Sequence, residues 1–183
     1  LDYYNENYKI KMNKIYNGIT MLPNEPLEET KKLFGVEENE YLLFVGRLVP
    51  EKAPETLIQA FKNIKTDKKL VIVGSSANTN TYVDNLKQMT KGDNRIIFTD
   101  YLYGKQLYEL YSNALAYVSA SKLEGLPITV LEAMSFARPI VLSDIGPHME
   151  VYSYDTSSGL TFEVNNTKNC SKAMEKILSL SPS

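Results

Sequence analysis

Two basic residues that follow a glycine form the first motif in the chain that could bind a ligand. Gly46 is followed by Arg47, and Lys52 comes five residues later. A glycine lets the backbone approach a ligand, and a guanidinium and an ammonium across one turn can both reach a pair of phosphates. The pattern predicts a diphosphate site. The same pattern also fits an arginine paired with a surface carboxylate and a solvated lysine at a helix start.

A second candidate segment, residues 119–143, reads as a strand, a loop, a helix and another strand. Pro127 suits the first turn of this helix. Backbone amides near the positive end of a helix bind anions, which predicts a second group of phosphate contacts. These amides belong to Gly125, Leu126, Ile128 and Thr129.

Two carboxylates flank the same helix start. Glu124 lies just before the turn, and Glu132 lies in the middle of a helix that is otherwise apolar almost all round. A carboxylate on a buried helix needs a partner or a ligand. Glu132 therefore binds a ligand, occupies a narrow exposed strip or meets a lysine.

Gly74 gives a weaker signal. It opens a short loop in which two serines offer hydroxyls and amides before a helix, and a plain helix cap explains this loop equally well. The chain contains neither a Walker A loop nor a G-x-G-x-x-G pattern.

Short apolar runs must form the strands that position these loops. From residue 41 onward they alternate with longer segments of helical period, which is typical of strand-helix units on a parallel sheet. This pattern predicts an α/β fold: a Rossmann-like, three-layer α/β/α arrangement with a mostly parallel sheet of about six strands. We expect strands at 41–46, 69–74, 95–99, 115–119, 139–143 and 160–163, and helices at 54–64, 82–89, 106–114, 128–137 and 172–180.

The first forty residues differ from the rest. Their composition predicts a linker and an edge strand near residues 10–16, followed by an Asn17-Gly18 turn and a polar loop at 23–29. We therefore divide the chain into residues 1–40, which lead into the domain, and a ligand-binding domain at 41–183.

Composition excludes several classes of protein. The chain has 183 residues, 43% of them hydrophobic and 23% charged, as in globular domains. Its net charge of -2 argues against nucleic-acid binding, which requires an excess of basic residues to meet the phosphates. A single cysteine and a single histidine cannot build a structural zinc site, so no metal is expected. No apolar stretch predicts a membrane span or an export signal, which makes the cytoplasm the expected compartment.

Three motifs in order resemble a known family. They are G-R-x-x-x-x-K at 46–52, E-x7-E from Glu124 to Glu132, and the strand PIVLSD with a loop ending in Glu150-Val151. Together they closely resemble the carboxy-terminal domain of the glycosyltransferase family 4 enzymes, which have the GT-B architecture. Residues 15–19 look like the strand and turn that lead into that domain, so the resemblance covers roughly residues 10–180.

The resemblance implies a site for a nucleotide-diphosphate-sugar. By that resemblance Arg47 and Lys52 hold the diphosphate, and the amides after Glu124 contact phosphate and sugar. Glu132 would bind the ribose hydroxyls, and Glu124 would face the sugar as the catalytic carboxylate. The segment Tyr101-Leu102 would line the base through its backbone.

Three residues depart from the family pattern, which has glycine at their positions. They are Ala53 after the lysine, Asp100 before the base loop and Ala137 at the end of the helix. Outside the motifs, we expect the lone His148 in the loop 145–150 to be solvated at the surface, and Cys170 to be inert.

The leading hypothesis is the donor-binding half of a retaining, metal-independent glycosyltransferase that acts in polysaccharide or glycan biosynthesis. It needs no cofactor besides its nucleotide-sugar substrate. A sugar or glycolipid acceptor would bind to an amino-terminal domain that is absent from this chain, and the resemblance allows peripheral membrane association of the full-length protein. The alternatives are a nucleotide-sugar epimerase of the same architecture and a non-catalytic nucleotide-sugar-binding module.

Overall fold

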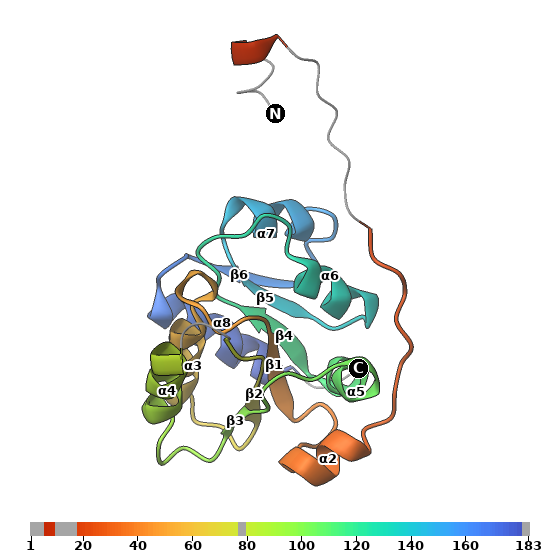
Figure 1. Ribbon diagram of the computed structural model, residues 1–183, viewed down its shortest axis with the longest axis vertical. Helices are drawn as coiled ribbons and strands as arrows, with labels where there is room; N and C mark the ends of the chain where they lie inside the picture. The colour runs from red at the N-terminus through yellow and green to blue at the C-terminus, as the bar shows by residue number, and fades with distance from the viewer. Residues whose placement is uncertain (1–5, 10–17, 77–79, 181–183) are drawn as a thin grey trace.

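The computed structural model describes residues 6–9, 18–76 and 80–180, and it has the expected three layers (Figure 1). One six-stranded sheet, with every neighbouring pair parallel, forms the middle layer. Its strands are β1 (Tyr41–Val45), β2 (Lys69–Val73), β3 (Ile96–Phe98), β4 (Ala116–Ser119), β5 (Ile140–Ser143) and β6 (Gly159–Phe162).

Helices cover both faces of the sheet. One buried cluster joins α3, α4 and α8 to the sheet, and the other joins α5, α6 and α7 to its opposite face. Successive residues of β1 alternate between the two clusters, which explains why its sequence is apolar without a break. The helices are α2 (Glu29–Phe34), the 3₁₀ turn η1 (Pro50–Lys52), α3 (Pro54–Lys62), α4 (Asn80–Met89), α5 (Gly104–Asn113), α6 (Ile128–Ser135), α7 (Gly146–Tyr152) and α8 (Thr167–Leu178).

The order of the strands places a crevice in the middle of the sheet. The sheet runs β3-β2-β1-β4-β5-β6, so the chain leaves β1 toward one edge and returns at β4 to build the other half. In open α/β sheets, ligands bind outside the carboxyl ends of the strands where this reversal occurs. The loops after β1 and β4 are the ones that carry the predicted cations and Glu124.

The predicted strands are confirmed to within one or two residues, but two helices were not expected. Helix α7 occupies most of the segment predicted as a loop, so that prediction was wrong: Gly146 and Pro147 begin a helix here instead of breaking one. Helix α2 follows the polar loop at 23–29. The predicted edge strand at 10–16 lies outside the described residues.

The three departures from the family pattern share one backbone property. Ala53, Asp100 and Ala137 all adopt the left-handed conformation, with φ of 48°, 57° and 53°. A residue with a Cβ is strained there, and glycine is not. The fold therefore has a glycine-type backbone at three positions where this sequence carries a residue with a Cβ.

Candidate functional site

A cavity of about 330 Å³ opens at the carboxyl ends of β1 and β4, at the reversal of strand order. It contains two cations, one carboxylate and the start of α6. It is lined by Phe44, Val45, Gly46, Arg47 and Lys52 from the β1 side, and by Tyr117, Ser119, Ser121, Glu124, Leu126, Pro127, Ile128 and Thr129 from the β4 side.

Lys52 and Glu124 form an ion pair inside this cavity. Lys52 Nζ lies 2.5 Å from Glu124 Oε2, and the two side chains are only 21% and 7% exposed. Ser121 Oγ donates a second hydrogen bond, 2.8 Å long, to Glu124 Oε1. The predicted phosphate-binding lysine and the predicted sugar-binding carboxylate thus lie in direct contact.

Arg47 is held much more loosely. Its side chain is 68% exposed, and Nη2 lies 3.7 Å from Glu51 Oε1, four residues further along the chain. This surface pairing is the alternative that the sequence left open. An exposed pair at this distance contributes little stability, so the guanidinium can swing to a ligand at small cost.

The start of α6 is fixed against β1 and β4. Tyr117 Oη lies 2.8 Å from Thr129 Oγ1 and 3.3 Å from the carbonyl oxygen of Val45. The amide of Ile128 donates to the carbonyl of Leu126 at 3.0 Å, so this amide, predicted to bind phosphate, is engaged within the turn.

Glu132 lies on α6 beyond the residues that line the cavity. Tyr111 Oη donates to Glu132 Oε2 at 2.9 Å, and partial burial raises the pKa of Glu132 although this hydrogen bond lowers it. The partner is therefore a tyrosine, and not the lysine considered from the sequence. A ribose hydroxyl would have to share this carboxylate with Tyr111.

Gly74, Tyr101 and Leu102 lie in loops beside the cavity and do not line it. Gly74 has a φ of 132°, and a Cβ there would lie 1.9 Å from the carbonyl oxygen of Gly46, so only glycine lets the loops meet. Tyr101 Oη donates to the carbonyl of Ser75 at 2.8 Å. Leu102 packs against the core cluster on the α5 face.

His148 is fully buried, so the prediction of a solvated surface histidine was wrong. The cause is α7, which places His148 on its inner face, against Ser143 at the end of β5. Burial lowers the pKa of His148, although its hydrogen bond with the Ser143 backbone raises it. Cys170 is buried, and burial raises the pKa of its thiol to about 12, in agreement with an inert residue.

Sequence reasoning missed the polar residues of β4 and its loop. Tyr117, Ser119 and Ser121 all line the cavity. Their position at the carboxyl end of a predicted strand was a usable signal, because side chains there face the ligand side of the sheet.

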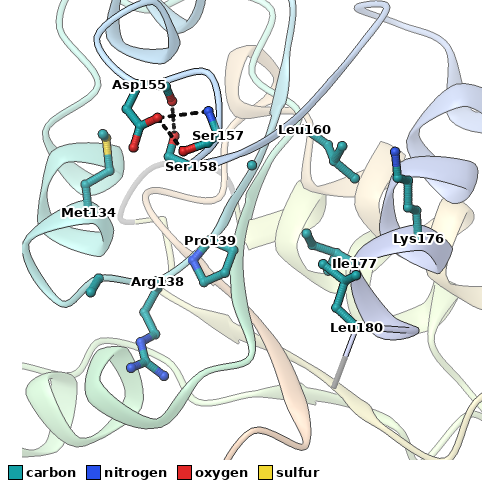
Figure 2. A pocket seen from close by; sticks show the side chains of 12 residues that line it. Met134, Arg138, Pro139, Asp155, Ser157, Ser158, Leu160, Lys176, Ile177 and Leu180 are labelled. Carbon is teal, nitrogen blue, oxygen red and sulfur yellow. Dashed lines mark hydrogen bonds between the residues drawn. The ribbon is translucent and has the colours of Figure 1, made fainter. Parts of the chain in front are cut away.

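A larger cavity, of about 630 Å³, lies at the opposite end of β5 and β6 (Figure 2). It contains two cations, but Arg138 donates to the carbonyls of Phe136 and Ala114 and points away from the Asp155 turn. Asp155 itself accepts two hydrogen bonds from Ser157. Arg138 and Asp155 are each held by partners of their own, so Lys176 is the cation of this cavity that remains for an anion. The smaller cavity offers two cations and the start of α6, and it is the better candidate.

The described part of the chain offers no cluster of three or more His, Cys, Asp or Glu side chains that could hold a metal ion. None of its helices is long and apolar enough to cross a membrane.

A Rossmann-like sheet with a cationic crevice at its reversal point is a nucleotide-binding architecture. Residues 27–183 match the family described as glycosyl transferases group 1, and the chain belongs to that family. It is 31% identical over 178 residues to an uncharacterized glycosyltransferase of Methanocaldococcus jannaschii, covering 92% of this chain and 45% of that protein. It is 32% identical over 148 residues to the alpha-maltose-1-phosphate synthase of Mycobacterium tuberculosis, a match that covers 75% of this chain and 38% of that protein.

Solved structures share the fold. Anabaena HepE, crystallised with UDP-glucose, superposes with a TM-score of 0.81 at 21% identity over 90% of this chain and 47% of that one. The carboxy-terminal domain of a group 1 glycosyl transferase from Francisella tularensis gives a TM-score of 0.74 at 20% identity, over 87% of this chain and 86% of that one. The chain thus spans half or less of the length of the curated relatives it matches, and most of a relative's isolated domain.

Proposed function

We propose that this chain binds the nucleotide-sugar donor of a glycosyltransferase. The observation that carries the proposal is the cavity between β1 and β4, which is lined by Arg47, Lys52 and the start of α6. Two cations and a helix start suit a diphosphate, and the Glu124 carboxylate suits a sugar hydroxyl. The family and the UDP-glucose complex of HepE support the same ligand class.

The proposed reaction uses the cations as transition-state stabilisers. As the bond between sugar and diphosphate breaks, negative charge grows on the departing phosphate, and Arg47 and Lys52 meet that charge. Glu124 would orient the sugar. We further propose that the transfer needs no metal ion, retains the anomeric configuration and serves glycan synthesis, with the acceptor held by a second domain and the protein in the cytoplasm.

The epimerase alternative would need a general acid and base that reach the sugar. The one histidine is buried behind the site, and Glu124 is paired with Lys52. The observed groups therefore favour transfer.

A melting series with UDP, GDP, ADP and TDP tests the proposal. A ligand that binds the folded chain stabilises it in proportion to the logarithm of its excess over Kd. We expect at least one diphosphate to raise Tm, and Arg47→Ala to weaken its binding about tenfold or more, because charge-assisted hydrogen bonds contribute about 1.5–3 kcal/mol. Absence of any shift at millimolar diphosphate would refute the proposal. Lys91→Ala, on the surface after α4, is the matched control.

A further inference from the structure

Three buried residues, of which Ser121 lines the cavity, are linked by hydrogen bonds to Glu124: His148 to Ser143, Ser143 to the backbone carbonyl of Ser121, and the hydroxyl of Ser121 to Glu124. His148 Nδ1 lies 3.0 Å from the carbonyl oxygen of Ser143 and 3.1 Å from its Oγ. Ser143 Oγ donates to the carbonyl oxygen of Ser121 at 2.6 Å. Ser121 Oγ donates to Glu124 Oε1 at 2.8 Å.

The chain of bonds has one direction. Ser143 has a single hydroxyl proton, and the short bond to the Ser121 carbonyl uses it. His148 Nδ1 must therefore be the donor toward Ser143, which fixes the Nδ1–H tautomer. The other ring nitrogen, Nε2, is buried without a hydrogen-bond partner among the described residues. Such an orphaned buried nitrogen is costly, so a residue of this kind calls for an explanation.

The structure assigns one: we propose that His148 is a positioning residue that holds the Glu124 carboxylate, through Ser143 and Ser121, where a donor sugar meets it. This inference rests on the proposed function. This relay of hydrogen bonds joins the end of β5 and the adjoining helix α7 to the loop after β4, which lies more than twenty residues earlier in the sequence. His148, Ser143 and Ser121 are all fully buried, so water does not compete for their bonds.

Ligand binding makes the relay matter more. Lys52 and Ser121 both donate hydrogen bonds to the Glu124 carboxylate and orient it. A diphosphate would draw Lys52 toward its own oxygens and leave Ser121 as the donor that still fixes the carboxylate. A hydrogen-bonding carboxylate must be placed within a fraction of an ångström to act on a sugar hydroxyl, so its support decides its effect.

The test compares UDP with UDP-glucose, by calorimetry, on the 183-residue chain. His148→Leu and Ser143→Ala each break the relay, and Ser143→Ala does so with little change in volume. We expect both to weaken UDP-glucose binding roughly tenfold, as for one lost hydrogen bond to a charged group, with UDP binding within about twofold of wild type. His148→Asn keeps an N–H at the position of Nδ1 and should restore most of the UDP-glucose affinity.

Val151→Ala is the matched control, because Val151 is buried on the same helix and lies outside the relay. It should lower Tm and leave both affinities unchanged. Equal losses of affinity for UDP and UDP-glucose in His148→Leu would overturn this inference but not the proposed function. Failure of His148→Asn to restore UDP-glucose affinity would do the same. Where a base other than uracil gives the Tm shift, its diphosphate and glucosyl donor replace UDP and UDP-glucose as the probes. Failure of the wild-type chain to bind any of UDP, GDP, ADP and TDP would overturn the proposed function, and the inference with it.

A ligand-free measurement tests the relay by itself. The chain has one histidine, so its ring nitrogens give a single set of ¹⁵N NMR signals. We expect the neutral Nδ1–H tautomer at pH 7. Detection of the Nε2–H tautomer would reverse the direction of the first bond and overturn the relay.

Discussion

At the scale of single residues, the ion pair between Lys52 and Glu124 governs how the site accepts an anion. A diphosphate must compete with Glu124 for the lysine, since the two side chains are 2.5 Å apart and largely buried. The negative carboxylate also repels the incoming phosphates. The ion pair therefore offsets the charge of Lys52 and lowers the affinity of the site for a diphosphate that carries no sugar.

Glu124→Gln should raise the affinity for UDP, by roughly threefold to tenfold, because it frees Lys52 and removes one negative charge next to the phosphates. From the sequence alone we would expect UDP binding to be spared by changes at Glu124. Calorimetry with UDP distinguishes the two expectations. Glu163→Gln changes the net charge equally at a distant, exposed position and should have no effect; a matching gain there would make the effect one of overall charge.

The left-handed alanines give a second prediction at this scale. Ala137→Gly should stabilise the chain by about 0.5–1 kcal/mol, because strain of about 1–2 kcal/mol is relieved and part of it is offset by the greater freedom of glycine in the unfolded state. Ala60→Gly, inside α3, should instead destabilise by about 1 kcal/mol or more. Chemical denaturation measures both, and a destabilised Ala137→Gly would contradict the assigned backbone strain.

At the scale of elements, a buried carboxylate joins α2 to α5. Glu109 Oε2 on α5 accepts hydrogen bonds from the amide and the hydroxyl of Thr30, both 2.9 Å long, and from the amide of Glu28 at 3.2 Å. These bonds, with the positive start of α2, favour the charged form. Burial alone would raise the pKa of Glu109. The hydrogen bonds from Thr30 and the neighbouring amides lower the pKa by more than burial raises it, so the net shift is downward.

A lowered pKa in the folded state means that Glu109 stabilises the fold above the carboxylate's ordinary pKa, and that this stability is lost as pH falls through the folded value. Glu109→Gln should therefore cost about 1–3 kcal/mol at pH 7, with the difference from wild type narrowing below about pH 4.3. Glu28→Gln, at the exposed N-cap of α2, should lower the free energy of unfolding by less than about 0.5 kcal/mol. A difference that stays constant from pH 7 to pH 3 would contradict this account.

The elements also show what a sequence can and cannot predict. The strands were predictable because an unbroken apolar run such as that of β1 fits a strand buried on both faces. Helix α7 was not, because its Gly146-Pro147 start carries the local signal of a turn. The burial of His148 depends on Ser143 and, beyond it, on a loop more than twenty residues away. Such a relay is a property of the packed molecule, and no spacing in the sequence reports it.

At the scale of the whole molecule, the topology brings the chemistry together. The motifs at 46–52 and 124–132 are more than seventy residues apart, and they meet because β1 and β4 are neighbours in the sheet. The same topology leaves a larger cavity at the other end of β5 and β6, where Arg138 is engaged by backbone carbonyls and Lys176 is the remaining cation (Figure 2). Size alone would select the wrong cavity for an anion.

The location of the diphosphate is the central claim, and backbone amide NMR of the ¹⁵N-labelled chain during a UDP titration tests it most directly. We predict that the largest shifts fall on residues 46–53 and 121–129, which surround the cavity between β1 and β4. The amide signals of residues 155–160, beside the cavity of Figure 2, should keep their chemical shifts. Shifts confined to residues 155–160, or none at saturating UDP, would contradict the claim.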